Sequence, residues 1–341
     1  MEKSAFYQQH LDQVSRSFAY CIANLKNPLK EWVGLSYLLF RVLDTIEDAP
    51  WVDSESKKSS FDQFHLCLNG QLQFDWTSQM PSAIPEVEKQ LMQSLPTLIR
   101  DFYLLPLPIQ QTIKKSLIMM SFGMQRFASQ THQGQIRLKN LKEVNQYCFF
   151  VAGLVGELLT DLIGSLLPKT FSTPELYFNS FRFGMFLQKI NLLKDQSDDE
   201  QQGRFLVPNR QELLLSLKQD SEGAIDYILQ MPVTQKEYRL FCAWSLFLGL
   251  SSLPWIENSF LRKLMEKIPR PVTQALFSKI ELVIHDNQAL VQLFKESTQK
   301  LRSHRHKPVV VKSGVRDESK WLTQIYQGQL SSDQLVRLGV V

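Results

Sequence analysis

The chain has 341 residues, of which 44% are hydrophobic and 21% are charged, so it can bury a substantial core as one large domain or two ordinary ones. Its net charge of +4 is mild and its basic residues are spread along the chain, which argues against nucleic-acid binding. The four cysteines lie far apart, with no C-x-x-C pair and no signal peptide at Met1. Zinc and disulfide scaffolds are therefore excluded, and a cytoplasmic protein with reduced thiols is expected.

The predicted elements are almost all helices. Apolar residues recur at spacings of three and four through most of the chain, and strand-like alternation is nearly absent. Breakers between these segments mark out roughly ten helices joined by short loops. The breakers lie at Pro28, Pro50, Pro81, Pro106, Pro108, Pro174, Pro208, Pro269 and Pro271.

The first stretch that suggests chemistry is SRSF, residues 15–18, which places Arg16 between two hydroxyl side chains. The planar fork of an arginine suits diphosphate oxygens, and Ser15 and Ser17 can add hydrogen bonds. The structural alternative for Ser15 is a helix cap. Both interpretations stay open at this point.

The second stretch is FRVLDTIEDAPW, residues 40–51, where Asp44, Glu47 and Asp48 share one helical face. We call these three residues the first carboxylate motif. Like charges at such spacings repel, so a cation is expected to compensate them. Arg41 is a candidate for diphosphate binding, and its alternative role is an ordinary i,i+3 ion pair with Asp44.

The third stretch, residues 147–164, combines closely spaced small residues with the aromatic side chains of Tyr147, Phe149 and Phe150. Small residues let helices approach closely or leave room for a long ligand. Aromatic faces stabilise a developing cation, and a dry wall protects it from water. Tight packing in a large core is the structural alternative.

The fourth stretch lies in FLQKINLLKDQSDDEQQGRF, where Gln188, Asn191, Asp195 and Asp199 step along one helical face. We call Asp195 and Asp199 the second carboxylate motif. Two such pairs facing each other across a bundle would suit Mg²⁺, which takes carboxylate oxygens, waters and substrate phosphates. The alternative is two solvated acidic helix ends.

The remaining features concern membranes and the end of the sequence. The uncharged run Leu240 to Ile256 is short for a membrane span, so we interpret it as a buried core helix and expect no transmembrane anchor. Residues 1–300 are predicted to form one helical domain, and residues 301–341 a C-terminal appendage made of a basic linker and a short amphipathic helix. His304 and His306 are two apart, which disfavours a metal site. Phosphate or peripheral membrane contact is the alternative role of this linker.

Four stretches together resemble the squalene/phytoene synthase family. DTIED (44–48) is similar to its D-x-x-E-D motif, and NLLKDQSDD (191–199) is similar to N-x-x-R-D-x-x-E-D. YCFFVAGLVG (147–156) is similar to the Y-C-x-x-V-A-G-x-V-G block, and SRSF to the amino-terminal motif. Weaker echoes, FCAW at 241–244 and KIPRPVTQAL at 267–276, favour the squalene synthase branch in a bacterial-type form.

The resemblance implies an all-α fold: a single-domain helical bundle of the class I isoprenoid (terpenoid) synthase type with a central active-site cavity. Its implied catalytic residues are Tyr147, Arg41, Asp44, Asp48, Asp195 and Asp199. Diphosphate would be bound by Ser15, Arg16, Ser17, Arg41, Gln188, Asn191, Lys194 and Arg204. Mg²⁺ would be held by Asp44, Glu47, Asp48, Asn191, Asp195 and Asp199.

Three positions depart from the family pattern, of which Asp198 in place of glutamate keeps the carboxylate and should be tolerated. Lys194 stands where the family usually has arginine, which keeps the charge but loses the bidentate fork. Leu206 stands where an aromatic residue usually precedes Pro208, which puts the shape of that pocket rim in question.

The implied activity is a prenyltransferase reaction on isoprenyl diphosphates. Two farnesyl diphosphates would condense head to head to presqualene diphosphate with Mg²⁺, and NADPH would reduce this intermediate to squalene. No G-x-G-x-x-G follows a strand, so an NADPH site would be built on helices. The alternatives are a dehydrosqualene or phytoene synthase without reductant, and an inactive family member acting as an assembly factor. Oligomeric state stays open.

Overall fold

A computed structural model describes residues 3–71, 80–129, 135–168, 171–262, 268–299 and 320–341. The side chains of Arg16 and Ser17 lie outside this description, as do His304 and His306. The chain divides into two compact units, and each is described by itself. The first unit comprises Met1–Gln130 and Asp161–Pro168, and the second comprises Thr131–Thr160 and Lys169–Val341.

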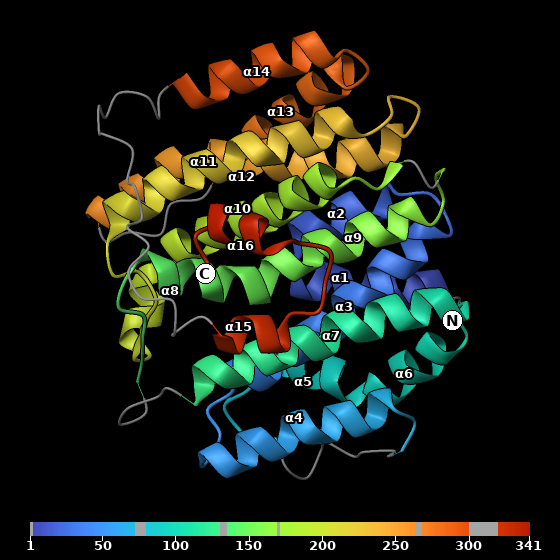
Figure 1. Cartoon of the computed structure of the whole chain (residues 1–341), viewed down its shortest axis with the longest axis vertical. Helices are drawn as coiled ribbons and strands as arrows, with labels where there is room; N and C mark the ends of the chain where they lie inside the picture. The colour runs from blue at the N-terminus through green and yellow to red at the C-terminus, as the bar shows by residue number, and fades with distance from the viewer. Residues whose placement is uncertain (1–2, 72–79, 130–134, 169–170, 263–267, 300–319) are drawn as a thin grey trace. The chain divides into compact units, whose positions relative to one another are not determined.

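The first unit is built around one long apolar helix, α3. This helix packs against α1, α2, α4, α5, α6 and α7 (Figure 1). Most of its side chains, from Leu29 to Glu47, are buried, because apolar residues at spacings of three and four cover more than one face. The helices of this unit are α1 (Lys3–Val14), α2 (Arg16–Ala23), α3 (Leu29–Asp48), α4 (Ser54–Leu68), α5 (Glu86–Gln93), α6 (Leu95–Tyr103) and α7 (Leu107–Ala128).

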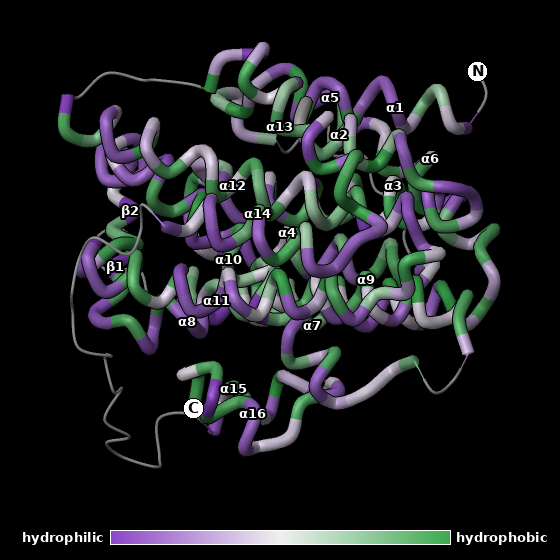
Figure 2. Tube along the Cα trace, turned by 90° about the horizontal axis from the view of Figure 1, so that it is seen from above, coloured by the Kyte–Doolittle hydropathy of each residue, from purple (hydrophilic) through white to green (hydrophobic). Residues whose placement is uncertain are grey.

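The second unit is centred on α10, which packs against α11, α12, α8 and the π-helix η2. Hydrophobic and hydrophilic residues alternate along most of these helices (Figure 2), as expected for helices that bury one face. The elements are β1 (Ile136–Arg137), α8 (Leu141–Cys148), η2 (Phe149–Gly153), α9 (Leu154–Gly164), α10 (Pro174–Gln201), β2 (Arg204–Phe205), α11 (Arg210–Gln230), α12 (Lys236–Arg262), α13 (Arg270–Val283), α14 (Asn287–Gln299), α15 (Lys320–Ile325) and α16 (Ser332–Arg337). The last residues of α9, from Asp161 on, belong to the first unit.

Two glycines let α10 approach η2 and α9 backbone to backbone. A Cβ atom at Gly156 would collide with the carbonyl oxygen of Ser180, and one at Gly184 would collide with that of Ala152. Only glycine leaves enough space for main chains this close. Tight packing is therefore what these small residues do in the second unit.

Arg239 joins several helix ends inside the second unit. Its side chain is fully buried, and its guanidinium donates to the carbonyl oxygens of Ile228, Met231 and Ile284 at 2.7 to 3.1 Å. It also donates to Oδ1 of Asn287 at 2.7 Å. Burial lowers the pKa of Arg239. One side chain thus satisfies the carbonyls at the ends of α11 and α13, which helices leave without internal partners.

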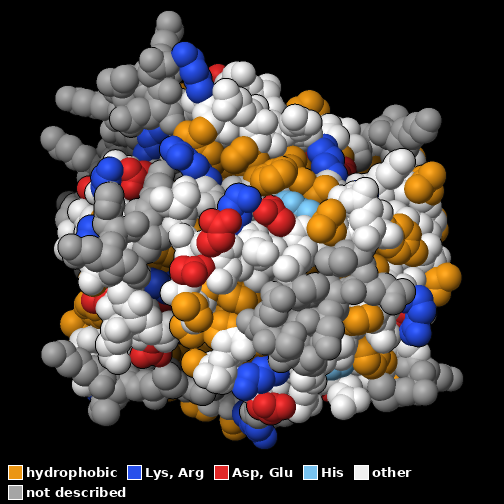
Figure 3. Space-filling view, turned by 90° about the horizontal axis from the view of Figure 1, so that it is seen from below, with side chains coloured by type: hydrophobic (Ala, Val, Ile, Leu, Met, Phe, Trp, Pro, Cys, Tyr) orange, Lys and Arg blue, Asp and Glu red, His pale blue; other side chains and the backbone are white. Residues whose placement is uncertain are grey.

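Two helical stretches, Leu141–Gly164 and Lys236–Arg262, are long and apolar enough to cross a membrane. In each, 67% of the most apolar window is buried inside the structure. A core helix gives the same signal, so this test carries little weight for a membrane span. On the face shown in Figure 3, the described acidic and basic side chains are interspersed rather than segregated by sign.

The predicted all-helical character is confirmed, with one local difference. Ile136–Arg137 and Arg204–Phe205 form a short parallel strand pair, which is too short for any alternation to show in the sequence. Helix α12 continues through Pro254, and so includes the whole run Leu240 to Ile256 that we interpret as a core helix. Residues 320–341 belong to the second unit, and the predicted boundary at residue 300 lies outside the described residues.

Candidate functional site

The first carboxylate motif lies near the end of α3, in the first unit. Asp48 is exposed and the side chain of Asp44 is 37% exposed, whereas Glu47 is buried. The main-chain carbonyl of Glu47 accepts a hydrogen bond from Nζ of Lys57 at 2.5 Å. The two aspartates are therefore the accessible carboxylates of this motif.

Arg41 precedes Asp44 by one helical turn and is held by two carboxylates. Its Nη2 lies 2.5 Å from Oε1 of Glu88 on α5, and its Nη1 lies 3.6 Å from Oδ2 of Asp44. Burial opposes the charge, but Asp44 and Glu88 outweigh it and raise the pKa of Arg41. Its Nε is buried and has no hydrogen-bond partner among the described residues. The predicted ion pair with Asp44 exists, and one donor is left for a further acceptor.

Ser15 occupies the N-cap position of α2, but its hydroxyl makes no capping hydrogen bond. It bonds instead to Tyr37 on α3, one turn before Arg41. Burial raises the pKa of Tyr37, while the bond from Ser15 and the charge of Arg41 oppose that rise. Ser15 is thereby brought to the same part of α3 as the predicted arginine.

The second carboxylate motif lies near the end of α10, in the second unit. Oδ2 of Asp195 is 3.1 Å from Nζ of Lys194, and both side chains are about half exposed. On the same helix Asn191 is exposed and Gln188 is half-buried. The cationic neighbour of Asp195 is thus solvated, which makes this pair weak.

Arg204 links Asp199 to Tyr147. Its Nε lies 3.4 Å from Oδ1 of Asp199, and its Nη2 donates to the hydroxyl of Tyr147 at 3.3 Å. Gly203 has a φ of 77°. This left-handed conformation ends α10 and reverses the chain, which allows Arg204 to reach Asp199 and Tyr147. Strand β2 then carries Arg204 back toward the helix. Three of the predicted site residues are therefore in contact.

Arg210, the first residue of α11, holds the end of α10 by hydrogen bonds. Its Nη1 donates to Oε1 of Gln196 at 2.7 Å and to the carbonyl of Leu193 at 3.3 Å. Its Nη2 donates to Glu257 of α12 at 2.6 Å. The turn of α10 that carries the second motif is thus attached to both α11 and α12.

Tyr147 stands at the end of α8, directly before η2. It is buried, and Phe149 and Phe150 behind it are fully buried. Phe149 stacks on Phe181 of α10, with ring centroids 4.7 Å apart. This packing excludes water from the region behind the Tyr147 ring.

The donors of the two motifs suit a hard divalent cation. In the described parts of the chain, no three His, Cys, Asp or Glu side chains form a cluster that could hold a metal. Each motif alone therefore offers one or two carboxylates. Mg²⁺ is commonly bound in this way, with waters and substrate phosphates completing its shell. The residue types fit Mg²⁺.

Sequence reasoning missed Glu88 and Tyr37. Tyr37 had a signal, because it lies four residues before Arg41 on the face that also carries Asp44 and Asp48. Glu88 had none, since it approaches from another helix, 47 residues along the chain.

Comparison with known proteins supports the resemblance found in the sequence. The family model described as squalene/phytoene synthase matches residues 11–220, which include every predicted site residue. The squalene synthase of Eremothecium gossypii is 33% identical over 204 residues, and that of Homo sapiens is 32% identical over 203 residues. Each match covers 59% of this chain and 45% of the relative, so the chain matches less than half of their length.

Solved structures show the same fold. The complex of TcSQS with the ligand BPH1237 superimposes with a TM-score of 0.74 at 22% identity, covering 100% of this chain and 98% of that one. A dehydrosqualene synthase in complex with a ligand gives a TM-score of 0.52 at 16% identity, covering 89% and 98%. The predicted isoprenoid synthase fold is confirmed. Because the family model covers more than half of the sequence, the chain belongs to the squalene/phytoene synthase family.

Proposed function

We propose that the chain is a prenyltransferase that condenses two farnesyl diphosphates head to head to presqualene diphosphate and reduces this intermediate to squalene. The observation that carries the proposal is Arg41. Its guanidinium is held beside the first carboxylate motif, and its buried Nε has no acceptor among the described residues. An oxygen of a diphosphate would be the acceptor for this Nε.

Binding of the diphosphate is assigned to the cationic and hydroxyl side chains of the predicted site. Within the first unit, Arg41 and Ser15 would hold phosphate oxygens, and Arg16 and Ser17 would join them from α2. Within the second unit, Lys194 and Arg204 would do the same. The remaining polar residues proposed for this role are Gln188 and Asn191.

Metal binding is assigned to the two motifs. Asp44, Glu47 and Asp48 on α3, and Asn191, Asp195 and Asp199 on α10, would hold Mg²⁺. When bound, Mg²⁺ neutralises charge on the departing diphosphate. The exposure of Asp44 and Asp48 supports their part in this assignment, and Glu47 is buried and thus the least accessible.

The reaction itself needs ionisation, attack and proton loss. The donor loses diphosphate, the double bond of the acceptor attacks the allylic cation, and loss of a proton closes the cyclopropane of presqualene diphosphate. Tyr147 is the residue we assign to that proton or to the diphosphate, because Arg204 holds its hydroxyl. The aromatic packing behind Tyr147 would keep water from the cation. In the second half-reaction presqualene diphosphate would lose its diphosphate and rearrange, and NADPH, when bound, would supply the hydride that reduces the resulting cation to squalene.

The test is incubation of the purified chain with farnesyl diphosphate and Mg²⁺, with and without NADPH, and mass analysis of extractable products. Squalene formed only with NADPH is the expected result. A C30 product that ignores NADPH would replace the proposal by dehydrosqualene or presqualene diphosphate synthesis. No product from farnesyl or geranylgeranyl diphosphate would favour a non-catalytic family member. Chelation of Mg²⁺ with EDTA should stop turnover, and added Mg²⁺ should restore it.

A further inference from the structure

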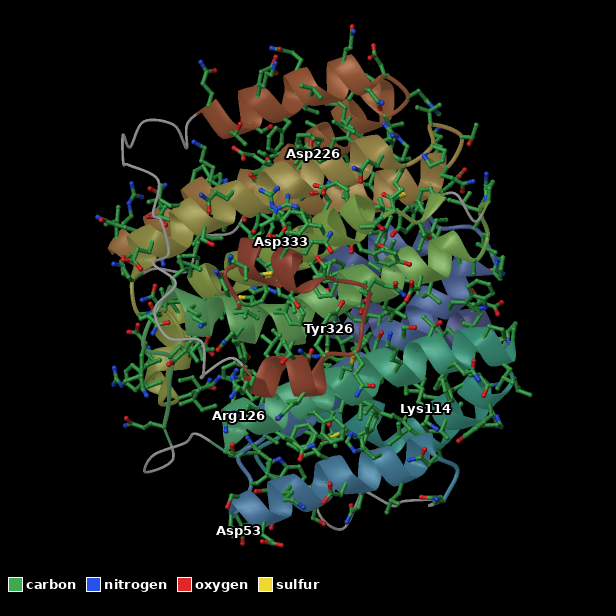
Figure 4. The ribbon with its side chains drawn as sticks, in the orientation of Figure 1. Asp53, Lys114, Arg126, Asp226, Tyr326 and Asp333 are labelled. Atoms are coloured by element: carbon green, nitrogen blue, oxygen red, sulfur yellow. The ribbon has the colours of Figure 1, made fainter. Side chains whose placement is uncertain are left out.

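Residues 320–341 pack closely on the helices that carry Tyr147. We propose that these residues act as a clamp that positions Tyr147 by holding α8 and η2 against α10. The role in catalysis rests on the proposed function, whereas the positioning does not. We call residues 320–341 the C-terminal clamp. Figure 4 shows Tyr326 at the turn between its two helices and Asp333 on the second of them.

The first attachment is made next to Tyr147 itself. Nε2 of Gln146 donates to the main-chain carbonyl of Val340 at 2.9 Å, and Nδ2 of Asn145 donates to that of Leu338 at 3.3 Å. Both side chains are buried. Without the clamp these two amides would lose their acceptors, which is costly for buried polar groups. The clamp therefore stabilises the turn of α8 that ends in Tyr147.

This attachment continues into α10 and α11 through a buried polar network. Oδ1 of Asn145 accepts from the hydroxyl of Ser216 at 3.5 Å, and that hydroxyl accepts from Nζ of Lys189 at 2.7 Å. Lys189 is fully buried and lies 2.5 Å from Oδ2 of Asp220. Lys189 follows Gln188 on the helix of the second carboxylate motif. Asn145 therefore connects the clamp to α10 as well as to α8.

The second attachment is a buried carboxylate on α9. Oε1 of Glu157, which is 1% exposed, accepts from the hydroxyl of Tyr326 at 2.9 Å and from the main-chain nitrogen of Gln329 at 2.6 Å. The Tyr326 hydroxyl also accepts from the nitrogen of Leu330 at 3.0 Å. Burial, together with Glu157, raises the pKa of Tyr326. A carboxylate this buried needs such donors, so Glu157 and the clamp stabilise each other.

Aromatic contacts cover the π-helix between these two attachments. Trp321 stacks on Phe150 with ring centroids 5.5 Å apart, and Tyr326 meets Phe149 edge to face at 5.0 Å. Phe149 and Phe150 are the second and third residues after Tyr147. The clamp thus contacts the residues on both sides of Tyr147 in sequence.

The experiment compares three full-length variants with the parent. Tyr326→Phe removes the hydroxyl that binds Glu157, and Gln146→Leu removes the donor to Val340. Val336→Ala is the matched control, because Val336 lies in the clamp but its side chain is 51% exposed. Two quantities are measured: hydrogen exchange of the α8 amides without substrate, and kcat and KM with farnesyl diphosphate. Circular dichroism checks that each variant folds.

We expect Tyr326→Phe and Gln146→Leu to speed α8 exchange and lower kcat, each by roughly 5- to 10-fold, with KM changed less than about twofold. Val336→Ala should match the parent. The proposal would be overturned if the variants speed hydrogen exchange within residues 320–341 but leave α8 exchange and kcat unchanged. Residues 320–341 would then cover α8 without positioning Tyr147. If one variant fails to fold, the other decides. If the parent protein forms no product from farnesyl diphosphate, the proposed function is refuted. Hydrogen exchange of the α8 amides then decides alone whether the clamp holds α8 in place.

Discussion

The two carboxylate motifs balance their charge in different ways. In the first motif, Asp44 is paired with Arg41 of its own helix, and Glu88 of α5 holds the other side of that guanidinium. In the second, Asp195 is paired with the exposed Lys194 next to it, and Asp199 is paired with Arg204, which follows a chain reversal. The first arrangement is largely local in sequence. The second exists only after α10 has ended and β2 has formed.

This difference shows which motif depends on the fold. A helix brings residues three and four apart together without help, so the first motif forms whenever α3 forms. Asp195 and Asp199 are likewise four apart on α10, but the pairing of Asp199 with Arg204 needs the left-handed Gly203 and the strand pair, and Arg210 attaches this part of α10 to its neighbours. We therefore expect substitutions around the second motif to act through neighbouring elements, and those around the first to act directly.

The largest effect is expected when either motif loses a carboxylate. Asp44→Asn and Asp195→Asn should each lower kcat by about 10³-fold, because each removes a negative oxygen ligand from the proposed metal site. Product formation from labelled farnesyl diphosphate gives the rate, and circular dichroism should show unchanged helix content. Asp62→Asn on α4 is the matched control, since Asp62 is an exposed helical carboxylate paired with Lys58. Activity within a few-fold of the parent in either motif variant would refute the metal assignment.

The next effect concerns the link that the second motif makes to Tyr147. Arg204→Met should lower kcat by roughly 10- to 100-fold, because Asp199 and Tyr147 lose their shared donor. Tyr147→Phe should give a similar loss, and the double variant should be little worse than either single one if the residues act as a unit. A double-mutant cycle on kcat measures this. Fully additive losses would show that Arg204 and Tyr147 act separately.

A smaller effect is expected at Glu88, the carboxylate of α5 that is paired with Arg41. Glu88→Gln keeps an acceptor for Arg41 but removes the charge, so it should cost about 1 kcal/mol of stability for a partly buried pair. Since the guanidinium would be less firmly oriented, KM for farnesyl diphosphate should rise by about threefold at similar kcat. Chemical denaturation and steady-state kinetics provide the two values. An unchanged KM would mean that Asp44 alone orients Arg41.

The smallest effect is expected at Lys194. Lys194→Arg restores the fork usual in the family, but the lysine is 55% exposed and its pair with Asp195 is solvated. Stability should change by less than about 0.5 kcal/mol, and KM should fall by at most about twofold. Thermal melting and kinetics on the same preparation test both numbers. A rate gain of tenfold would show that this exposed position contacts the diphosphate tightly.

The sequence predicted the helical character and the breaks at prolines, because apolar spacing and prolines act locally, but it predicted roughly ten helices where the described residues form sixteen α-helices and one π-helix. Which stretches carry function stays a prediction, although all of them lie within the residues that match the family model. It did not predict η2, since a π-helix of five residues has the same apolar pattern as the helices on either side. Nor did it predict the strand pair that positions Arg204, because two residues are too few to show alternation.

The predicted appendage illustrates the main limit of local reasoning. The short helix α15 was expected from its amphipathic sequence, but its partners Phe149, Phe150 and Glu157 lie more than 160 residues earlier in the chain. Contacts of this separation depend on how the whole unit folds, and neither composition nor spacing contains them.

Arg239 gives the second unit a property that no local pattern would suggest. Its one guanidinium is shared by the last carbonyls of α11 and α13 and by the first side chain of α14. Loosening any one of these helix ends leaves a buried positive charge with fewer acceptors, which penalises partial opening. The three helices are therefore expected to unfold in a single cooperative step rather than fray one after another.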